Sequence, residues 1–218
     1  YVNILSNEQY TMLIDNFGKG YSEWCGKRVN RFKVRNEQTK FFYIKNILTG
    51  ECWSNFYEPQ IRKPDEYTAI FSSAISKYVR KDGNVVTTTK IAVSPEDNIE
   101  LHQLEFENLG EEMVELDVIS YLDPILCDVN TDITFPTFHK LFFYPYRYQN
   151  AIVLEKRERN PKVNNLLLLV TCFTSVEDSS FEVETDKMRI LGNCNSVSQA
   201  NIIEQDKNYS QEVKLATD

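Results

Sequence analysis

The chain has 218 residues, of which 42% are hydrophobic and 26% are charged. This length supports one sizeable hydrophobic core, so we expect one globular domain, with two small domains as the alternative. Only 7 glycines and 7 prolines occur, and no long apolar run does, which excludes collagen-like or low-complexity chains and a membrane-spanning helix. The 32 acidic and 24 basic residues give a net charge of −8, which argues against nucleic acid and anionic membrane surfaces as partners.

Two further features bear on location. The chain begins Tyr1-Val2-Asn3, with neither Met nor a basic and apolar leader, so we expect a piece of a longer protein without a secretion signal. The odd number of widely spaced cysteines cannot form a complete set of intrachain disulfides, which predicts mostly buried thiols in a cytoplasmic protein. These cysteines are Cys25, Cys52, Cys127, Cys172 and Cys194.

Short runs of aromatic and β-branched residues, separated by turn residues, recur from Tyr10 to Ile190 and are typical of β-strands. Gly18-Lys19-Gly20 predicts a tight turn rather than a phosphate-binding loop, because no third glycine and no Gly-Lys-Ser/Thr ending follow. A second reversal is expected at 46–51. Lys81 to Asn84 contains Asp-Gly and predicts a hairpin turn before a strand from Val85 to Val93.

Later segments follow the same pattern less regularly. From Ile99 to Phe106 the apolar residues change face, which predicts a bulge near Gln103 or a strand buried on both sides. A reversal at 108–111 precedes an expected strand from Glu112 to Leu122 with one solvated face. Leu166 to Val170 is apolar throughout and predicts a central strand covered on both faces.

No segment before Ser196 has a convincing helical stripe of apolar residues, and only the part from Ser196 onward predicts a short helix or coil. The sequence therefore predicts an all-β fold, a large antiparallel β-sandwich over residues 1–196. Residues 197–218 are expected to form a polar tail or the start of a linker.

The sequence predicts no catalytic residue, metal or cofactor. The two histidines, His102 and His139, lie among apolar or aromatic neighbours, where we expect structural, hydrogen-bonded side chains. Asp128 to Asp132 imitates a calcium loop, but Ile133 replaces the required glycine and His139 the closing glutamate. No zinc-ligand spacing occurs, and no pair of carboxylates is singled out for glycoside cleavage.

Aromatic rings beside hydroxyl and amide groups are the candidates for binding carbohydrate. They are Tyr21, Ser22, Trp24, Trp53 and Tyr57. Flat rings that stack on sugar faces, framed by hydrogen-bonding groups, are typical of carbohydrate surfaces. The alternative is that these rings fill the sandwich core. If Trp24 is exposed, Trp24→Ala should weaken binding of β-glucan oligosaccharides without unfolding the domain.

Several motifs resemble those of inverting glycoside phosphorylases of the cellobiose phosphorylase type, glycoside hydrolase family 94, which include part of the cyclic β-1,2-glucan synthases. The opening from Leu5 to Trp24 is similar to the family's "LSNGRYxVMIxxxGxGYSxW", with Glu8 in place of glycine. The segments that resemble the other family motifs are 29–32, 42–54, 93–101, 119–121, 135–138 and 184–192. The wording of the opening favours the branch of cyclic β-1,2-glucan synthases and 1,2-β-oligoglucan phosphorylases.

This resemblance implies a galactose mutarotase-like β-supersandwich, followed in the parent protein by a helical linker and an (α/α)₆ barrel. The barrel would hold the catalytic acid and the phosphate site, so this domain would be non-catalytic, and the parent would be a bacterial hexosyltransferase. The implied partners are a β-glucan or oligosaccharide, that catalytic domain and a second subunit in a homodimer. The resemblance also implies that the parent is membrane-associated if it is a glucan synthase, although this domain would not contact a membrane.

Two other functions remain open from the sequence. One is a stand-alone carbohydrate-binding module that recognises β-glucan through an aromatic platform, which a stop codon near Asp218 would favour. The other is a sugar mutarotase, since the fold is shared. That activity needs a catalytic His and Glu in the concave face of the sheet, and a shared fold alone does not confer function.

Overall fold

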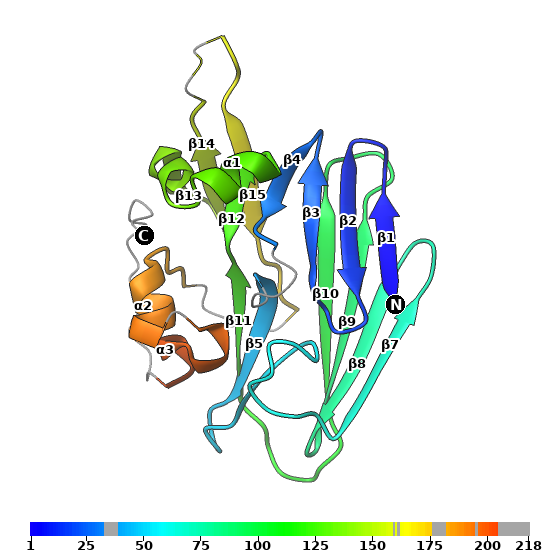
Figure 1. Cartoon of the computed structure of the whole chain (residues 1–218). Helices are drawn as coiled ribbons and strands as arrows, with labels where there is room; N and C mark the ends of the chain where they lie inside the picture. Colours follow the sequence, from blue (N-terminus) through cyan, green and yellow to red (C-terminus); the bar gives the residue numbers. More distant parts are fainter. Residues whose placement is uncertain (33–38, 159, 161, 176–181, 195, 205–218) are drawn as a thin grey trace. The chain divides into compact units, whose positions relative to one another are not determined.

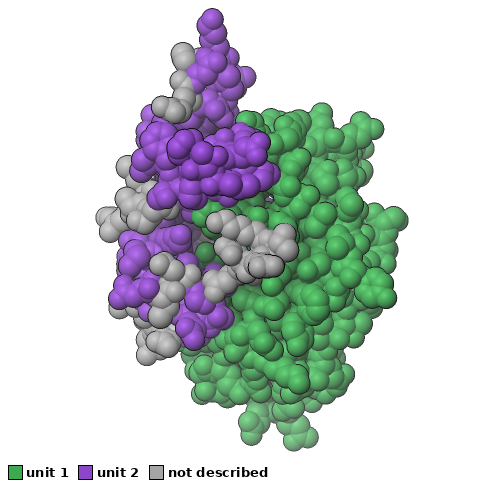
Figure 2. Space-filling model, viewed as in Figure 1, with its two compact units in different colours: residues 1–124 green, residues 125–218 purple. Residues whose placement is uncertain are grey.

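The computed structural model describes residues 1–32, 39–158, 160, 162–175, 182–194 and 196–204 (Figure 1). Strands joined in antiparallel pairs dominate these residues, which confirms the all-β prediction. The chain divides into two compact units, residues 1–124 and residues 125–218 (Figure 2). No helix of the described part is long and apolar enough to cross a membrane.

The first unit contains strands from three antiparallel sheets. One has the order β1 (Val2–Ser6), β2 (Tyr10–Asp15), β3 (Gly20–Trp24), β4 (Lys27–Asn30). The second has the order β10 (Glu100–Asn108), β9 (Val85–Val93), β8 (Ser76–Asp82), β7 (Glu66–Phe71). The third has the order β11 (Leu116–Leu122), β5 (Lys40–Asn46), β6 (Cys52–Ser54). Strands β1 and β2 lie against β9, so the first two sheets form two layers of a sandwich.

Side-chain alternation explains how these sheets bury a core. On β8 and β9 the residues of one face are buried, among them Tyr78 and Ile91, whereas residues of the other face are partly exposed. Lysines occupy that second face, and Lys90 and Lys81 pair with glutamates of the neighbouring strands. The sheet therefore has one buried face and one solvated face, as period-two alternation requires, and the buried face also carries polar side chains such as Arg80 and Thr89.

The second unit has a three-stranded antiparallel sheet, β13 (Phe143–Tyr148), β14 (Ala151–Lys156) and β15 (Leu166–Thr171). The short strand β12 (Pro124–Cys127) begins at the unit boundary. The described part of this unit also contains short helices: α1 (Val129–Thr134), η1 (Phe138–Phe142), α2 (Lys187–Leu191), η2 (Gly192–Cys194), η3 (Val197–Gln199) and α3 (Asn201–Glu204). Helices α1, η1 and α2 lie before Ser196, where the sequence predicted none, because they are too short to show an apolar stripe.

The tight turns lie at or close to the predicted positions. Gly18 has φ +87° and its backbone nitrogen donates to the Asp15 carbonyl, so the chain reverses from Asp15 to Gly18, slightly before the predicted Gly18-Lys19-Gly20, and Gly20 already begins β3. A Cβ atom on Gly20 would lie 1.9 Å from the Leu13 carbonyl oxygen, so the second glycine is required by close packing. The predicted hairpin after Lys81 is confirmed, since Asp82 pairs with Val85 across a two-residue turn in which Gly83 has φ +60°.

Three strand predictions were wrong in detail. Strand β10 pairs with β9 residue by residue from Glu100 to Asn108, so it has no bulge at Gln103, and Leu101 on it is exposed. Strand β11 begins at Leu116 rather than Glu112, because its partner β5 ends at Asn46. Strand β15 lies at the edge of its sheet, and its exposed leucines show that it is not a covered central strand.

The side chains of four cysteines are described, and they divide equally between core and surface. Cys52 and Cys127 are buried, whereas Cys25 and Cys172 are exposed, so the prediction of mostly buried thiols holds for half of them. Burial raises the pKa of the Cys52 thiol to about 11, which makes it unreactive at neutral pH. Residues 205–218, most of the predicted tail, lie outside the described residues.

Candidate functional site

The residues predicted to bind carbohydrate do not form one surface. Strand β3 alternates, so Tyr21 lies on the opposite face of the first sheet from Ser22 and Trp24. The ring of Tyr21 is covered by the guanidinium group of Arg28, whose Cζ lies 3.2 Å from the ring centroid, and it also contacts Phe32. Tyr21 therefore presents a cation–π contact where a sugar ring would stack.

The other three predicted rings are buried or half-buried. Trp53 is 1% exposed and packs with Ile44 and Val85, so its ring fills the core, the alternative considered from the sequence. Tyr57 is half-buried, and its ring contacts those of Phe17 and Tyr67. Trp24 is also half-buried, and its indole nitrogen is shielded from solvent without a hydrogen-bond partner. Whether any of these residues binds sugar stays a prediction.

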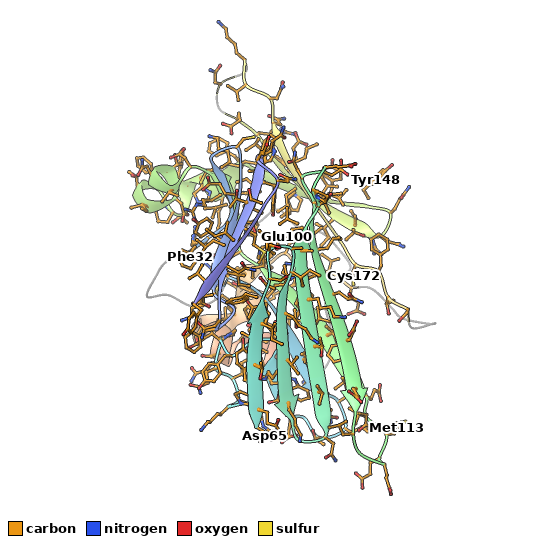
Figure 3. The ribbon with its side chains drawn as sticks, turned by 90° about the vertical axis from the view of Figure 1, so that its right-hand side faces the viewer. Phe32, Asp65, Glu100, Met113, Tyr148 and Cys172 are labelled. Carbon is orange, nitrogen blue, oxygen red and sulfur yellow. The ribbon has the colours of Figure 1, made fainter. Side chains whose placement is uncertain are left out.

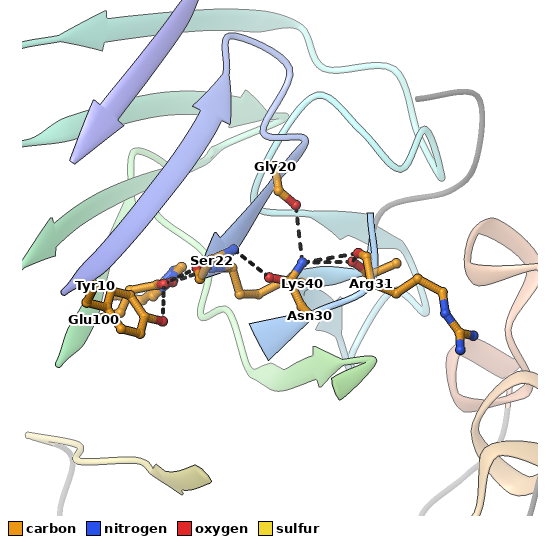
Figure 4. A network of polar contacts seen from close by, with 9 residues as sticks. Tyr10, Gly20, Ser22, Asn30, Arg31, Lys40 and Glu100 are labelled. Carbon is orange, nitrogen blue, oxygen red and sulfur yellow. Dashed lines mark hydrogen bonds and ion pairs between the residues drawn. The ribbon is translucent and has the colours of Figure 1, made fainter. Parts of the chain in front are cut away.

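Ser22 leads to the principal polar site of the first unit, which is built around the carboxylate of Glu100. Five residues make it up, and we call them the Glu100 cluster: Tyr10, Ser22, Lys40, Glu100 and His102 (Figures 3 and 4). They come from β2, β3, β5 and β10, so the cluster joins strands of all three sheets in this unit.

Both carboxylate oxygens of Glu100 are fully used. Tyr10 Oη donates to Oε2 over 2.9 Å, and Ser22 Oγ donates to the same oxygen. Lys40 Nζ donates to Oε1, which His102 Nε2 also contacts, and Lys40 Nζ donates to Ser22 Oγ over 2.6 Å. The side chain of Glu100 is only 9% exposed, so these partners replace the water that a carboxylate requires.

A buried asparagine extends this network toward β4. Asn30 is fully buried, and its Oδ1 accepts a hydrogen bond from the backbone nitrogen of Ser22 over 2.8 Å. Its Nδ2 donates to the Gly20 carbonyl and to Thr39 Oγ1 (Figure 4). Asn30 thus holds the backbone of β3 at Gly20 and at Ser22, on both sides of Tyr21, and so helps to orient the Ser22 hydroxyl that bonds Glu100.

The electrostatics of the cluster favour a permanent negative charge. Burial alone would raise the pKa of Glu100, but attraction to Lys40 and the hydrogen bond and charge of His102 outweigh it and hold that pKa well below its ordinary value. Burial and the neighbouring Glu100 charge raise the pKa of the Tyr10 hydroxyl, which keeps it a neutral donor. A strongly ionised carboxylate is a weak base at neutral pH, so the arrangement suits a structural ion pair better than proton transfer.

Both histidines have hydrogen-bond partners, as expected from the sequence. His102 contacts Glu100, and its ring also lies 5.9 Å from that of Phe42. In the second unit, His139 Nε2 lies 2.9 Å from Asp132 Oδ1, and both side chains are buried. The described residues contain no group of three His, Cys, Asp or Glu side chains that could hold a metal ion.

Two aspartates, Asp128 and Asp186, cap the N-termini of short helices in the second unit. Asp128, the first residue of the rejected calcium-like segment, accepts hydrogen bonds from the backbone and hydroxyl groups of Thr131 and caps α1. Asp186 caps α2 in the same way through the backbone nitrogen of Met188. Glu184 accepts from the backbone of Asp186 and pairs with Arg189, so this motif serves local structure.

Comparison with known proteins assigns this arrangement to a family. The model of the supersandwich domain of glycosyl hydrolase 94 matches residues 1–218. The chain belongs to this family. It is also similar to the cyclic beta-(1,2)-glucan synthase NdvB of Rhizobium meliloti (strain 1021), with 28% identity over 205 residues. The match covers 90% of this chain but only 7% of NdvB.

As a glycosyl hydrolase 94 supersandwich domain, the chain confirms the family and fold that its motifs implied. Tyr10, Asn30 and Glu100 lie in segments that resemble family motifs, but the sequence alone indicated no role for them. Their common property is that they converge on one buried network (Figure 4). A signal was present in the sequence, since polar residues in strands that are otherwise apolar need buried partners.

Proposed function

We propose that this domain is the non-catalytic N-terminal module of a glucan-processing enzyme of the glycoside phosphorylase or cyclic β-1,2-glucan synthase type. The observation that carries the proposal is the similarity to a much longer protein: the match covers 90% of this chain but only 7% of a glucan synthase. The Glu100 cluster supports it, because its carboxylate is committed to Lys40 and to structural hydrogen bonds.

In this proposal the domain shapes the active site and the dimer interface of a separate (α/α)₆ catalytic domain. An apolar ridge in the second unit supports such docking. It lies in the nine-residue segment from the end of α1 to η1. Its four exposed large side chains are Ile133, Phe135, Phe138 and Leu141. Clustered exposed apolar residues mark surfaces that bind another protein surface.

The test uses the full-length protein that contains this domain. Deletion of residues 1–218 should abolish glucosyl transfer or phosphorolysis, and addition of the separate domain should restore part of it. Phe138→Ser with Leu141→Ser should lower the turnover at least tenfold while the domain stays folded. The matched control is Ile70→Ser, because Ile70 is 51% exposed on β7 outside the ridge and should leave turnover unchanged. Full activity of the deleted protein would overturn the proposal.

The alternative is a stand-alone module that recognises β-glucan. It predicts glucan binding by residues 1–218 and no dependence of any catalytic activity on the apolar ridge. The same ridge variants therefore separate the two functions, since only an enzyme module links Phe138 and Leu141 to turnover.

A further inference from the structure

A row of tyrosines lies on one face of the second unit's sheet. Tyr144, Tyr146 and Tyr148 are alternate residues of β13, so their side chains point to the same face at intervals of about 6.8 Å. Tyr146 and Tyr148 are 42% and 57% exposed. Aromatic side chains usually bury their rings, so two exposed rings in a regular row need an explanation.

The register of the sheet places two further rows of apolar side chains beside this row. Val153 and Ala151 of β14 are the neighbours of Tyr146 and Tyr148 on the same face, and both are buried. Leu167 and Leu169 of β15 form the next row and are exposed. One wall is therefore aromatic, the other wall is aliphatic, and the floor is made of small side chains. We call this feature the tyrosine trough and define it by Tyr146, Tyr148, Ala151, Val153, Leu167 and Leu169.

Polar groups stand at one end of the tyrosine trough. Glu155, the neighbour of Tyr144 on β14, accepts a hydrogen bond from Asn165 Nδ2 over 2.7 Å. Arg157 Nε lies 3.7 Å from Glu155 Oε1, and the Arg157 guanidinium lies 3.7 Å from the centroid of Tyr144. The single carboxylate on this face is thus balanced by a cation, and Asn165 and Arg157 are exposed hydrogen-bonding groups.

We propose that the tyrosine trough binds a neutral, β-linked oligosaccharide, with pyranose rings stacked on Tyr146 and Tyr148. The trough itself has no charged side chain although the chain carries a net charge of −8, which matches an uncharged ligand. Phenolic rings offer both a flat apolar face and a hydroxyl, and the end at Arg157 and Asn165 offers further donors to sugar hydroxyls.

The choice of glucose as the sugar rests on the proposed function. The trough would give the enzyme a second contact with its glucan, in a part of the domain that sequence reasoning did not consider. A protein surface would instead cover the aliphatic wall and exclude water from Arg157 and Asn165, so we assign the oligosaccharide and let the experiment address a protein partner.

The test is isothermal titration of residues 1–218 and of the full-length protein with linear β-1,2-, β-1,3- and β-1,4-gluco-oligosaccharides. The double variant Tyr146→Ala/Tyr148→Ala should bind at least tenfold more weakly, because two stacked rings are removed. Tyr148→Phe, which keeps the ring, should retain most of the affinity. Phe106→Ala is the matched control, since it removes an exposed ring of β10, outside both the apolar ridge and the tyrosine trough, and should leave the affinity unchanged. Unfolding midpoints check that all variants are folded.

Unchanged affinity of the double variant, or no binding of any of these sugars by the wild type, would overturn the tyrosine trough. So would loss of binding in Trp24→Ala alone, which would place the sugar at the rim predicted from the sequence. If Tyr146→Ala/Tyr148→Ala changes the oligomeric mass in light scattering but not the sugar affinity, the surface is a protein contact, and this result also overturns the proposal of an oligosaccharide site. Turnover of the ridge variants does not depend on the trough, so failure here is distinguishable from failure of the proposed function.

Discussion

Tyr10 and Glu100 lie 90 residues apart in the sequence, yet Tyr10 Oη donates a hydrogen bond to Glu100 Oε2 over 2.9 Å. This contact joins β2 of the first sheet to β10 of the second. Lys40 Nζ pairs with the other oxygen of Glu100 and adds β5 of the third sheet. One carboxylate therefore connects strands of three sheets, and its charge should contribute to the stability of the first unit.

Replacement of this carboxylate should be costly. Glu100→Gln leaves the ammonium group of Lys40, which is 16% exposed, without its counter-charge, and we expect the free energy of unfolding to fall by about 3 kcal/mol. The control is Glu105→Gln on the same strand, where the ion pair with Lys90 is exposed and the expected loss is below about 0.5 kcal/mol. Equal unfolding midpoints in urea for the two variants would contradict a structural role of Glu100.

The same charge predicts a pH dependence. The pKa of Glu100 is well below 4.5 in the folded state, so its contribution to stability is fully present above the unfolded pKa and is lost as the pH falls toward the folded pKa. The free energy of unfolding of the wild type should thus decrease below about pH 4.5, and that of Glu100→Gln should decrease less. Urea titrations at pH 7, 5, 4 and 3 measure this difference. A constant gap between the two proteins at all four values would be the contrary result.

The fold was largely predictable, because strands and turns leave local signals. The β8–β9 hairpin is an example, since Asp-Gly occupies its turn and Val85 to Val93 alternates. The strand predictions that were wrong depend on neighbouring strands, which the local sequence does not reveal. Residues 112–115 have the strand pattern but lie beyond the end of β5. Leu166 to Val170 is apolar throughout, yet it forms an edge strand whose Leu167 and Leu169 are exposed.

The candidate site was predictable only in part. Alternation along β3 already separates Tyr21 from Ser22 and Trp24, so the sequence contained the information that these residues do not share a face. The role of Ser22 could not be predicted, because its partner Glu100 lies on a strand of another sheet, 78 residues further along the chain. Burial of Trp53 similarly depends on its packing against Val85 of another sheet.

The two tryptophans should respond differently to truncation. Trp53 is 1% exposed, so Trp53→Ala should lower the free energy of unfolding by about 3–5 kcal/mol through loss of buried surface and formation of a cavity. Trp24 is half-buried at the end of β3, and Trp24→Ala should cost less. Urea unfolding followed by circular dichroism compares both variants with the wild type. A larger loss for Trp24→Ala would indicate that its ring, rather than that of Trp53, belongs to the core.

Glycine in place of Glu8 should stabilise the fold. It lies between β1 and β2 with φ +75°, a left-handed conformation that costs an L-residue energy, at the position where the family's opening motif has glycine. The backbone there is held by Asn7, whose Oδ1 accepts from the backbone of Tyr10 and whose Nδ2 donates to the carbonyls of Ser94 and Asp97. Because these contacts do not involve the Glu8 side chain, Glu8→Gly should raise the free energy of unfolding by about 0.5–1 kcal/mol. Glu8→Ala is the control: it keeps a Cβ atom and therefore the strain, so its urea midpoint should stay at the wild-type value. Equal midpoints for the glycine and alanine variants would show that the left-handed conformation at Glu8 carries no cost.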